Sequence, residues 1–320
     1  MVVVRLIVIL ALTGFWALAQ PAPVIIDTDA GSDDFLAIAF LLAHPNVPIE
    51  AITVANGMAH VDAGARNVIR LLDVAGRREI PVFAGRGAPL RGAAEFPADW
   101  RKASDDLPGV ELPAASRRQE PRPAASYLLE RLRRGPPARI LALGPLTNLA
   151  EAFLRDPSIA ANIQEIVSMG GAIHVPGNNL NKTAEWNIFI DPYAARIVFR
   201  SGVRIRLIPL DATNKVPIGA EFLREFQSAA RSPVGKIAAQ VLATDRSMID
   251  QSEFYAWDPL AAVALLYPAV VKTNPLRIDV RQDPPEQGRT VQLAGKPNAE
   301  VALDADAATF HKLFLDVFRK

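Results

Sequence analysis

Short apolar runs alternate with segments of helical periodicity along most of the chain. The runs are rich in β-branched residues, as buried strands are, and they lie at 24–26, 49–54, 82–83, 140–143, 165–169 and 204–208. Between them, apolar residues recur with the period of a helix, most clearly at about 33–43, 61–75 and 305–318. Such alternation is typical of an α/β protein with helices on both faces of a mostly parallel sheet. We therefore predict an open, Rossmann-like α/β sheet flanked by helices.

Residues 85–123 interrupt this alternation, because they are rich in proline, glycine and charge and show little periodicity. A loop of this length in a compact domain is usually functional or disordered, and we expect one of the two here. No internal repeat and no clear linker divides the rest of the chain, so we predict one domain from residue 20 to residue 320.

The composition excludes several classes of protein. Half of the 320 residues are hydrophobic, which is enough for a large core. Lys and Arg number 35 against 34 Asp and Glu, so nothing indicates the basic face that binding to a nucleic acid polymer requires. The chain has no cysteine, which rules out disulfides, thiolate metal sites and cysteine nucleophiles.

The N-terminus has the pattern of a secretory signal. Arg5 precedes an uncharged run at 6–19, which ends in the small-x-small sequence Ala17-Leu18-Ala19. A bilayer span needs about 20 apolar residues, and this run is shorter. An uncleaved anchor and a buried helix are the alternatives. We predict a cleavable signal peptide at 1–19 and an exported protein, periplasmic or secreted, without a stable membrane anchor.

Four carboxylates lie close together in the segment DTDAGSDD at residues 27–34, between a buried strand and an apolar helix. An extended backbone points Asp27 and Asp29 to the same side, and Gly31 allows a turn that brings Asp33 and Asp34 back toward them. A helix N-terminus stabilises one carboxylate by about 0.3–1 kcal/mol, which is too little for four. Converging carboxylates need a cation, and oxygen ligands suit Ca²⁺ or Mg²⁺. The alternative is a helix cap beside a solvated acidic loop.

Phosphohydrolases of the haloacid dehalogenase type also carry Asp-x-Asp after the first strand, with the first Asp as nucleophile. They have Thr or Val two residues after the second Asp, where this chain has Gly31. The mechanism of these phosphohydrolases does not need the pair Asp33-Asp34, so the segment favours a metal site.

The segment at 27–34 closely resembles the first motif of the nucleoside hydrolase family, Asp-Thr-Asp-x-Gly-x-Asp-Asp. Later motifs of that family are matched in the same order by LALGPLTN at 141–148, MGG at 169–171, AEWN at 184–187 and WDP at 257–259. The resemblance covers nearly the whole mature chain. It implies the nucleoside hydrolase fold and an enzyme that hydrolyses the bond between ribose and a nucleobase.

The resemblance also implies a metal site and a general base. The Ca²⁺ ligands would be Asp29, Asp34, Asp258 and the main-chain carbonyl of Leu143. Several members have Thr in place of Leu143, but the carbonyl is unchanged by the substitution. Asp29 would also be the general base for the metal-bound water, whose pKa the cation lowers.

Other residues would bind the nucleoside. By resemblance, those near the ribose are Asp33, Asn56, Met169, Glu185, Asn187 and either Asn178 or Asn179. The loop before Glu185 is one residue longer than usual, which leaves the choice between the two asparagines open. Cleavage builds oxocarbenium character on the ribose, and surrounding carboxylates stabilise that charge.

Many members of the family have a His general acid directly before the last metal-ligand Asp, but this chain has Trp257 there. The purine-preferring branch has Trp at that place and a second Trp in the loop after the third strand, which FPADWR at 96–101 resembles. This implies that Trp100 and Trp257 sandwich the base. Stacking contributes roughly 1–3 kcal/mol per base and favours a protonated purine. The source of the proton for the base stays open.

We therefore predict Ca²⁺-dependent hydrolysis of purine ribonucleosides. The resemblance to the purine branch also implies that the enzyme is a homodimer. A broad or pyrimidine-preferring hydrolase is the alternative within the family. Outside it, the alternatives are a metal-dependent phosphohydrolase and a nucleoside-binding protein without activity.

Overall fold

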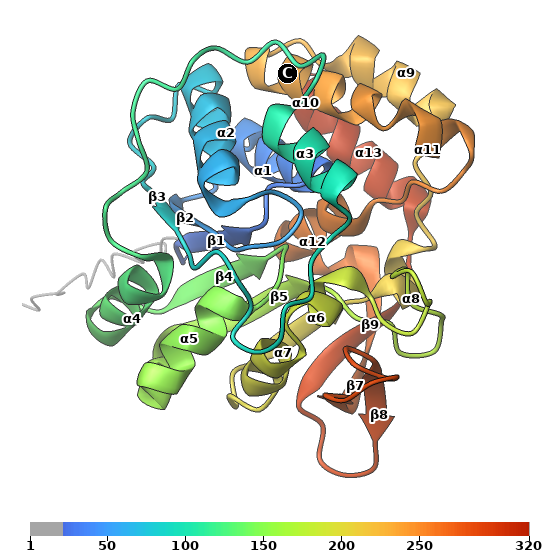
Figure 1. Ribbon diagram of the computed structural model, residues 1–320. Coiled ribbons are helices and arrows are strands. Elements are labelled where there is room, and N and C mark those ends of the chain that lie inside the picture. Colours follow the sequence, from blue (N-terminus) through green and yellow to red (C-terminus); the bar gives the residue numbers. More distant parts are fainter. Residues whose placement is uncertain (1–21, 320) are drawn as a thin grey trace, which may run out of the picture.

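The computed structural model describes residues 22–319, so the signal peptide predicted at 1–19 lies outside the described residues. None of the helices in the described part is long and apolar enough to cross a membrane. The described chain folds as one α/β unit around a central sheet (Figure 1).

The central sheet has nine strands within residues 22–319, in the order β3-β2-β1-β4-β5-β6-β9-β7-β8. Their bounds are β1 Val24–Thr28, β2 Ile49–Val54, β3 Val82–Ala84, β4 Ala138–Ala142, β5 Ile163–Met169, β6 Ile205–Ile208, β7 Val271–Val280, β8 Thr290–Leu293 and β9 Ala299–Ala305. Neighbours from β3 to β9 pair in parallel, whereas β7 is antiparallel to β9 and β8. The predicted mostly parallel sheet is confirmed, and all six predicted runs are strands.

Helices cover both faces of the sheet, as predicted (Figure 1). One apolar core lies under α1 Ser32–Ala43, α2 Val61–Val74, α9 Ala220–Ala229, α10 Pro233–Thr244, α12 Trp257–Leu266 and α13 Ala307–Phe318. A second core lies on the other face, under α4 Ala124–Arg134, α5 Thr147–Arg155 and α7 Pro192–Phe199. The short helices are α6 Trp186–Ile190, α8 Leu210–Thr213, α11 Arg246–Asp250, η1 Pro157–Asn162 and η2 Pro268–Val270. The last helix begins two residues later than predicted, since β9 extends to Ala305.

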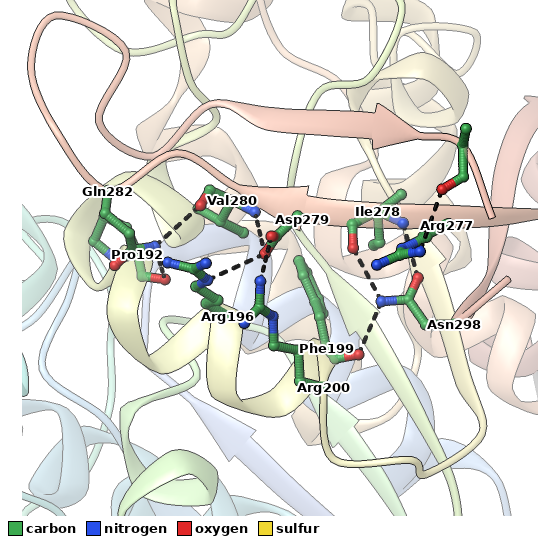
Figure 2. Close-up of polar contacts among 11 residues, drawn as sticks. Pro192, Arg196, Phe199, Arg200, Arg277, Ile278, Asp279, Val280, Gln282 and Asn298 are labelled. Atoms are coloured by element: carbon green, nitrogen blue, oxygen red, sulfur yellow. Dashed lines mark hydrogen bonds and ion pairs between the residues drawn. The ribbon is translucent and has the colours of Figure 1, made fainter. Parts of the chain in front are cut away.

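Side chains join the antiparallel end of the sheet to α7 (Figure 2). Asp279 on β7 accepts a 2.6 Å hydrogen bond from Arg200 and lies 3.4 Å from Nε of Arg196. Gln282 and Asn298 donate to the carbonyls of the first and last residues of α7, at 3.0 and 2.9 Å. These contacts hold β7 and the segments next to it against α7.

The segment at 85–123 differs from the prediction, because residues Ala98–Asp106 form a helix, α3. Only Arg101 and Ser104 of α3 are buried, so apolar periodicity could not indicate it. Tertiary hydrogen bonds hold this helix: Asn67 on α2 donates to the carbonyls of Ser104 and Asp105 at 3.2 and 2.9 Å. The side chain of Asp105 in turn accepts a 2.8 Å bond from the backbone N–H of His60.

Candidate metal and ribose site

The predicted site residues gather at the carboxyl ends of β1, β2, β4 and β5. The strand order reverses direction at β1, because the chain passes from β1 to β2 and β3 on one side and then to β4 on the other. Ligands of open α/β sheets bind in the crevice at such a reversal point. The segment at 27–34 leaves β1 there, and the motif at 141–148 leaves β4 beside it.

The turn between β1 and α1 fixes the carboxylate of Asp34. Ala30 has a left-handed φ of 59°, which turns the chain into α1. Asp34 then accepts hydrogen bonds from the backbone N–H groups of Gly31 at 2.9 Å and Asp29 at 3.2 Å. The hydroxyl of Thr28 donates to the same carboxylate. Asp34 thus caps its own helix while its carboxylate stays at the sheet edge.

Two glycines make room for Asp29. A Cβ at Gly57 would lie 2.0 Å from Oδ2 of Asp29, and one at Gly144 would lie 2.8 Å from its Cβ. The backbone N–H of Met58 donates a 2.8 Å hydrogen bond to Oδ2 of Asp29. The side chain is therefore held between the loops that follow β2 and β4, and its orientation is set before any ligand binds.

Asp33, Asp34 and Asp258 offer carboxylate oxygens that all lie within 4.8 Å of one another, as a metal site requires. Asp258 comes from the first turn of α12 and is 1% exposed. Its Oδ1 is buried and has no hydrogen-bond partner within residues 22–319. An unpaired buried carboxylate oxygen beside two other carboxylates is unfavourable unless a cation binds there.

Burial and repulsion by neighbouring carboxylates raise the pKa values of Asp29, Asp33 and Asp258. Burial raises the pKa of Asp29, and the charge of Asp34 raises it further. The same two causes raise the pKa of Asp33. Burial and then the charges of the three neighbouring carboxylates raise the pKa of Asp258. Asp29 therefore interacts electrostatically with the three converging carboxylates. The four carboxylates together suit a divalent cation.

The carbonyl of Leu143 lies at the same edge, one residue beyond the end of β4. Nδ2 of Asn187 donates to this carbonyl at 2.7 Å and lies 3.4 Å from Sδ of Met169. Because a carbonyl oxygen has two lone pairs, the bond from Asn187 leaves Leu143 able to contact a cation. The structure thus brings three predicted site residues from three different motifs into contact.

Glu185 is held by the backbone around it. Its carboxylate accepts hydrogen bonds from the N–H groups of Asn187 at 2.8 Å, Gly171 at 2.9 Å and Ile188 at 3.2 Å. Burial raises the pKa of Glu185, and these backbone donors oppose the rise. Glu185 is therefore a fixed carboxylate at the N-terminus of α6 and links that helix to the glycine pair after β5.

Asn178 and Asn179 both lie in the loop before Glu185. Oδ1 of Asn178 accepts from the backbone N–H of Trp186 at 3.1 Å. Oδ1 of Asn179 accepts from the backbone N–H groups of Thr183 and Ala184, at 3.0 and 3.2 Å, and the side chain is buried. Both asparagines thus accept from backbone N–H groups of the motif at 184–187, and both stay candidate ribose ligands.

Asp27 lies apart from the other carboxylates of its motif. Its Oδ1 accepts from the hydroxyl of Thr53 at 2.6 Å and from Nδ2 of Asn148 at 2.8 Å. Burial raises the pKa of Asp27 to about 7, and these two hydrogen bonds oppose the rise. Asp27 joins β1 to β2 and to the start of α5, which is a structural role and not that of a nucleophile.

The two predicted base-binding indoles contact other aromatic rings and not each other. Trp257 lies 5.0 Å from Phe254 and 6.0 Å from Tyr255 between ring centroids, and its Nε1 is buried without a partner in the described chain. Trp100 on α3 is 42% exposed and lies 5.8 Å from the ring of Trp186. The indole sandwich stays a prediction.

Sequence reasoning missed two charged residues at the edge of the site. Nη2 of Arg101 donates to Oδ1 of Asn56 at 2.8 Å. Asp245 lies between α10 and α11, and burial raises its pKa to about 6, while a hydrogen bond with Ser32 opposes the rise. The charge of Asp245 in turn raises the pKa of Asp33. Asp245 stands in no recognisable motif and Arg101 only ends the segment at 96–101, and the packing of α10 and α3 brings them to Asp33 and Asn56, respectively.

A buried ion network at the opposite end of α12 fixes the helix that carries Asp258. Arg139 on β4 and Arg206 on β6 both lie against Glu165 on β5, at 2.7 and 3.5 Å. The two guanidinium groups also donate to the last carbonyls of α12, Arg206 at 3.1 Å and Arg139 by a short bond. Cations at the C-terminal end of a helix oppose its dipole favourably. Three central strands thereby set the position of α12.

Comparison with known proteins bears on the predicted family. The model of the family described as inosine-uridine preferring nucleoside hydrolase matches residues 24–312. The chain is 35% identical over 309 residues to the pyrimidine-specific ribonucleoside hydrolase RihA of Citrobacter koseri, covering 92% of this chain and 97% of that protein.

Two solved structures extend this comparison. The plant nucleoside hydrolase PpNRh1 has a TM-score of 0.86 at 31% identity, covering 93% of this chain and 99% of that one. The purine-preferring ribonucleoside hydrolase of Gardnerella vaginalis has a TM-score of 0.81 at 27% identity, covering 93% and 98%. The predicted family and fold are confirmed. The predicted purine branch receives no support, because the similar proteins include both pyrimidine-specific and purine-preferring enzymes.

The raised pKa values predict how pH and metal act together on stability. In the metal-free protein, the carboxyl groups bind protons more tightly when folded than when unfolded, where their pKa is about 3.8. The free energy of unfolding should therefore fall as pH rises from about 4 through the raised pKa values. Ca²⁺ should remove most of this fall, because it stabilises the ionised carboxylates.

Thermal unfolding between about pH 5 and pH 8, with a chelator and with excess Ca²⁺, measures this effect. We expect the melting temperature to fall with pH in the chelated protein and to stay nearly constant with Ca²⁺. Equal pH dependence under both conditions would show that these carboxylates do not share a cation.

Proposed function

The chain belongs to the inosine-uridine preferring nucleoside hydrolase family and is a ribonucleoside hydrolase, and on that premise we propose that it is Ca²⁺-dependent and prefers purine ribonucleosides. The observation that carries the proposal is the convergence of Asp33, Asp34 and Asp258 within 4.8 Å, with one carboxylate oxygen of Asp258 unpaired. The products would be ribose and the free base.

The donor set supports Ca²⁺ at this place. Asp29, Asp34, Asp258 and the carbonyl of Leu143 supply only oxygen atoms, which hard cations prefer. Nitrogen and sulfur ligands, which zinc favours, are absent from this set. When bound, the cation would orient a water and the ribose hydroxyls and would lower the pKa of that water.

Different side chains around the ribose would act in different parts of the reaction. The hydrogen bond from Met58 fixes Oδ2 of Asp29, and the carboxylate would take a proton from the attacking water. The water oxygen forms a bond to C1′ while the electron pair of the C1′–N bond passes to the base, which takes up a proton. Asp33 and Glu185 carry the negative charge that stabilises the positive charge developing on the ribose.

The preference for purines is proposed from the aromatic residues. Trp257 directly precedes Asp258 in the first turn of α12, and its Nε1 is buried without a hydrogen-bond partner in the described chain. Trp100 is exposed on a helix that packs over Trp186 of the ribose motif. Two indoles at the rim of a ribose site favour a large base. Similarity to the pyrimidine-specific enzyme makes uridine the alternative substrate.

Two wider expectations accompany this proposal. Cleavage of residues 1–19 and export would place the enzyme outside the cytoplasm. Assembly as a homodimer, the state implied by the purine branch, is the second expectation. N-terminal sequencing of the protein released from cells and its mass in solution address them directly.

Asp29→Asn should lower kcat for nucleoside hydrolysis by at least about 100-fold, because a general base contributes a factor of this size or more. Asp27→Asn is the matched control: its carbonyl still accepts from Thr53 and Asn148, so most activity should remain. Reducing-sugar release from inosine, with and without a chelator, measures both.

Ribose release by the wild-type protein should cease on removal of the metal and return with Ca²⁺. If Asp27→Asn is inactive and Asp29→Asn is active, the roles of the two carboxylates are reversed. Nucleoside binding without ribose release would favour a binding protein.

Trp257→Ala should lower kcat/KM for inosine by roughly 5- to 150-fold, the range that corresponds to a stacking free energy of about 1–3 kcal/mol. The loss on uridine should be much smaller, because its single ring offers less area for stacking. Kinetics on inosine, adenosine, guanosine, uridine and cytidine measure the ratio, with Trp100→Ala as the partner variant. Equal losses on inosine and uridine would contradict a purine sandwich.

A further inference from the structure

Arg101 is a buried cation that contacts the predicted site residue Asn56, and neither the sequence motifs nor the proposed mechanism gives this arginine a role. Its side chain is only 4% exposed, and Nε is buried without a hydrogen-bond partner in the described chain. Its ion-pair partner, Glu95, is mostly exposed and lies 3.5 Å from Nη1. A buried guanidinium with an unsatisfied N–H destabilises the fold relative to an apolar residue, so stability does not account for it.

The helix that carries Arg101 does not depend on it for its position. Asn67 and His60 on the α2 side hold the C-terminal end of α3 through Ser104 and Asp105. At the other end, Phe96 stacks on Trp186 of the ribose motif with centroids 4.8 Å apart. Segment 95–101 therefore runs from the motif at 184–187 to the loop after β2. Contacts that do not involve Arg101 hold the chain on either side of this arginine.

The contact of Arg101 with Asn56 determines which way the amide of Asn56 faces. A guanidinium has donors only, so the amide oxygen of Asn56 must face Arg101. The amide nitrogen of Asn56 then points away from Arg101 as a donor. Without Arg101 the amide could turn by half a revolution and present its oxygen on that side instead.

The loop that begins with Asn56 also touches the proposed general base. Gly57 approaches Asp29 so closely that a Cβ would lie 2.0 Å from Oδ2, and Met58 donates to the same oxygen at 2.8 Å. A change at Asn56 is therefore transmitted directly to the carboxylate that would accept the proton.

We propose that Arg101 is a positioning residue of the hydrolase: it fixes the amide of Asn56 as a donor and holds the loop at 56–58 against Asp29. This inference rests on the proposed function, since it concerns the same site. It assigns to α3 a role in the hydrolysis of every nucleoside, separate from any role of Trp100 in base preference.

A double-mutant cycle of Arg101→Ala and Asn56→Ala tests the inference. Arg101→Ala should lower kcat by about 10- to 100-fold, the usual range for residues that orient a catalytic group, with little change in KM. The double variant should be no slower than Asn56→Ala alone, because Arg101 acts through Asn56. Free guanidinium ion should restore part of the activity of Arg101→Ala but none of that of the double variant.

Arg70→Ala is the matched control. Arg70 also ties residues 85–123 to the body, by 2.7 Å bonds to the carbonyls of Pro113 and Leu112 and by a 3.0 Å bond to Asn67, which holds α3. It should keep wild-type kcat and show no response to guanidinium. If Arg101→Ala does not fold, Arg101→Lys replaces it in the cycle, because a single ammonium lacks the planar fork.

Three results would overturn the inference while the wild-type enzyme releases ribose. These are unchanged kcat in the folded Arg101 variant, additive losses in the cycle, or an equal loss in Arg70→Ala. Failure of the wild-type protein to release ribose from any nucleoside would instead overturn the proposed function, so the two failures are distinguishable.

Discussion

The repulsion among buried carboxylates at one edge of the sheet is the constraint on which the rest of the structure depends. The pKa values of Asp29, Asp33 and Asp258 are raised by burial and then by the charges of neighbouring carboxylates, including that of Asp34, so the ionised cluster destabilises the metal-free fold. The scaffold does not relieve this by letting the side chains turn to solvent. Backbone N–H groups hold the carboxylates of Asp29 and Asp34, and two glycines allow the loops to close around Asp29. The protein thus maintains a preorganised anionic site whose favourable partner is a cation and then an oxocarbenium-like sugar.

Asp258 is distant in sequence from the other carboxylates of this cluster, and α12 positions it there. The charge distribution along the helix agrees with its dipole: a carboxylate lies in the first turn, and the guanidinium groups of Arg139 and Arg206 bind the last carbonyls. Glu165 joins the two arginines across the central strands. Because the network lies at the end of α12 opposite the site, it can fix the helix without adding positive charge beside the carboxylates.

The residues proposed to recognise the sugar and those proposed to recognise the base lie in different kinds of structure. Those proposed for the ribose come from the segments that follow parallel strands and from α6. The aromatic residues proposed for the base come from the start of α12 and from α3, a helix that packs mainly through hydrogen bonds and the ring of Trp186. Similarity over nearly the whole chain identifies the family, while the similar proteins include both a pyrimidine-specific and a purine-preferring hydrolase. Arg101 links the two parts through Asn56.

The sequence by itself determined the alternation of strands and helices, the parallel sheet, the acidic motif at 27–34 and the family, because these depend on local periodicity and on residues adjacent in the chain. The acidic pattern alone could not separate Asp27 from Asp29, which only the resemblance to the family distinguished, since their different environments arise from Thr53 and Asn148 on neighbouring elements. The sequence could not show α3, whose buried face is polar. The roles of Arg101, Asp245 and the network around Glu165 were decided only by tertiary structure, because a charged residue acquires such a role from what folding places against it.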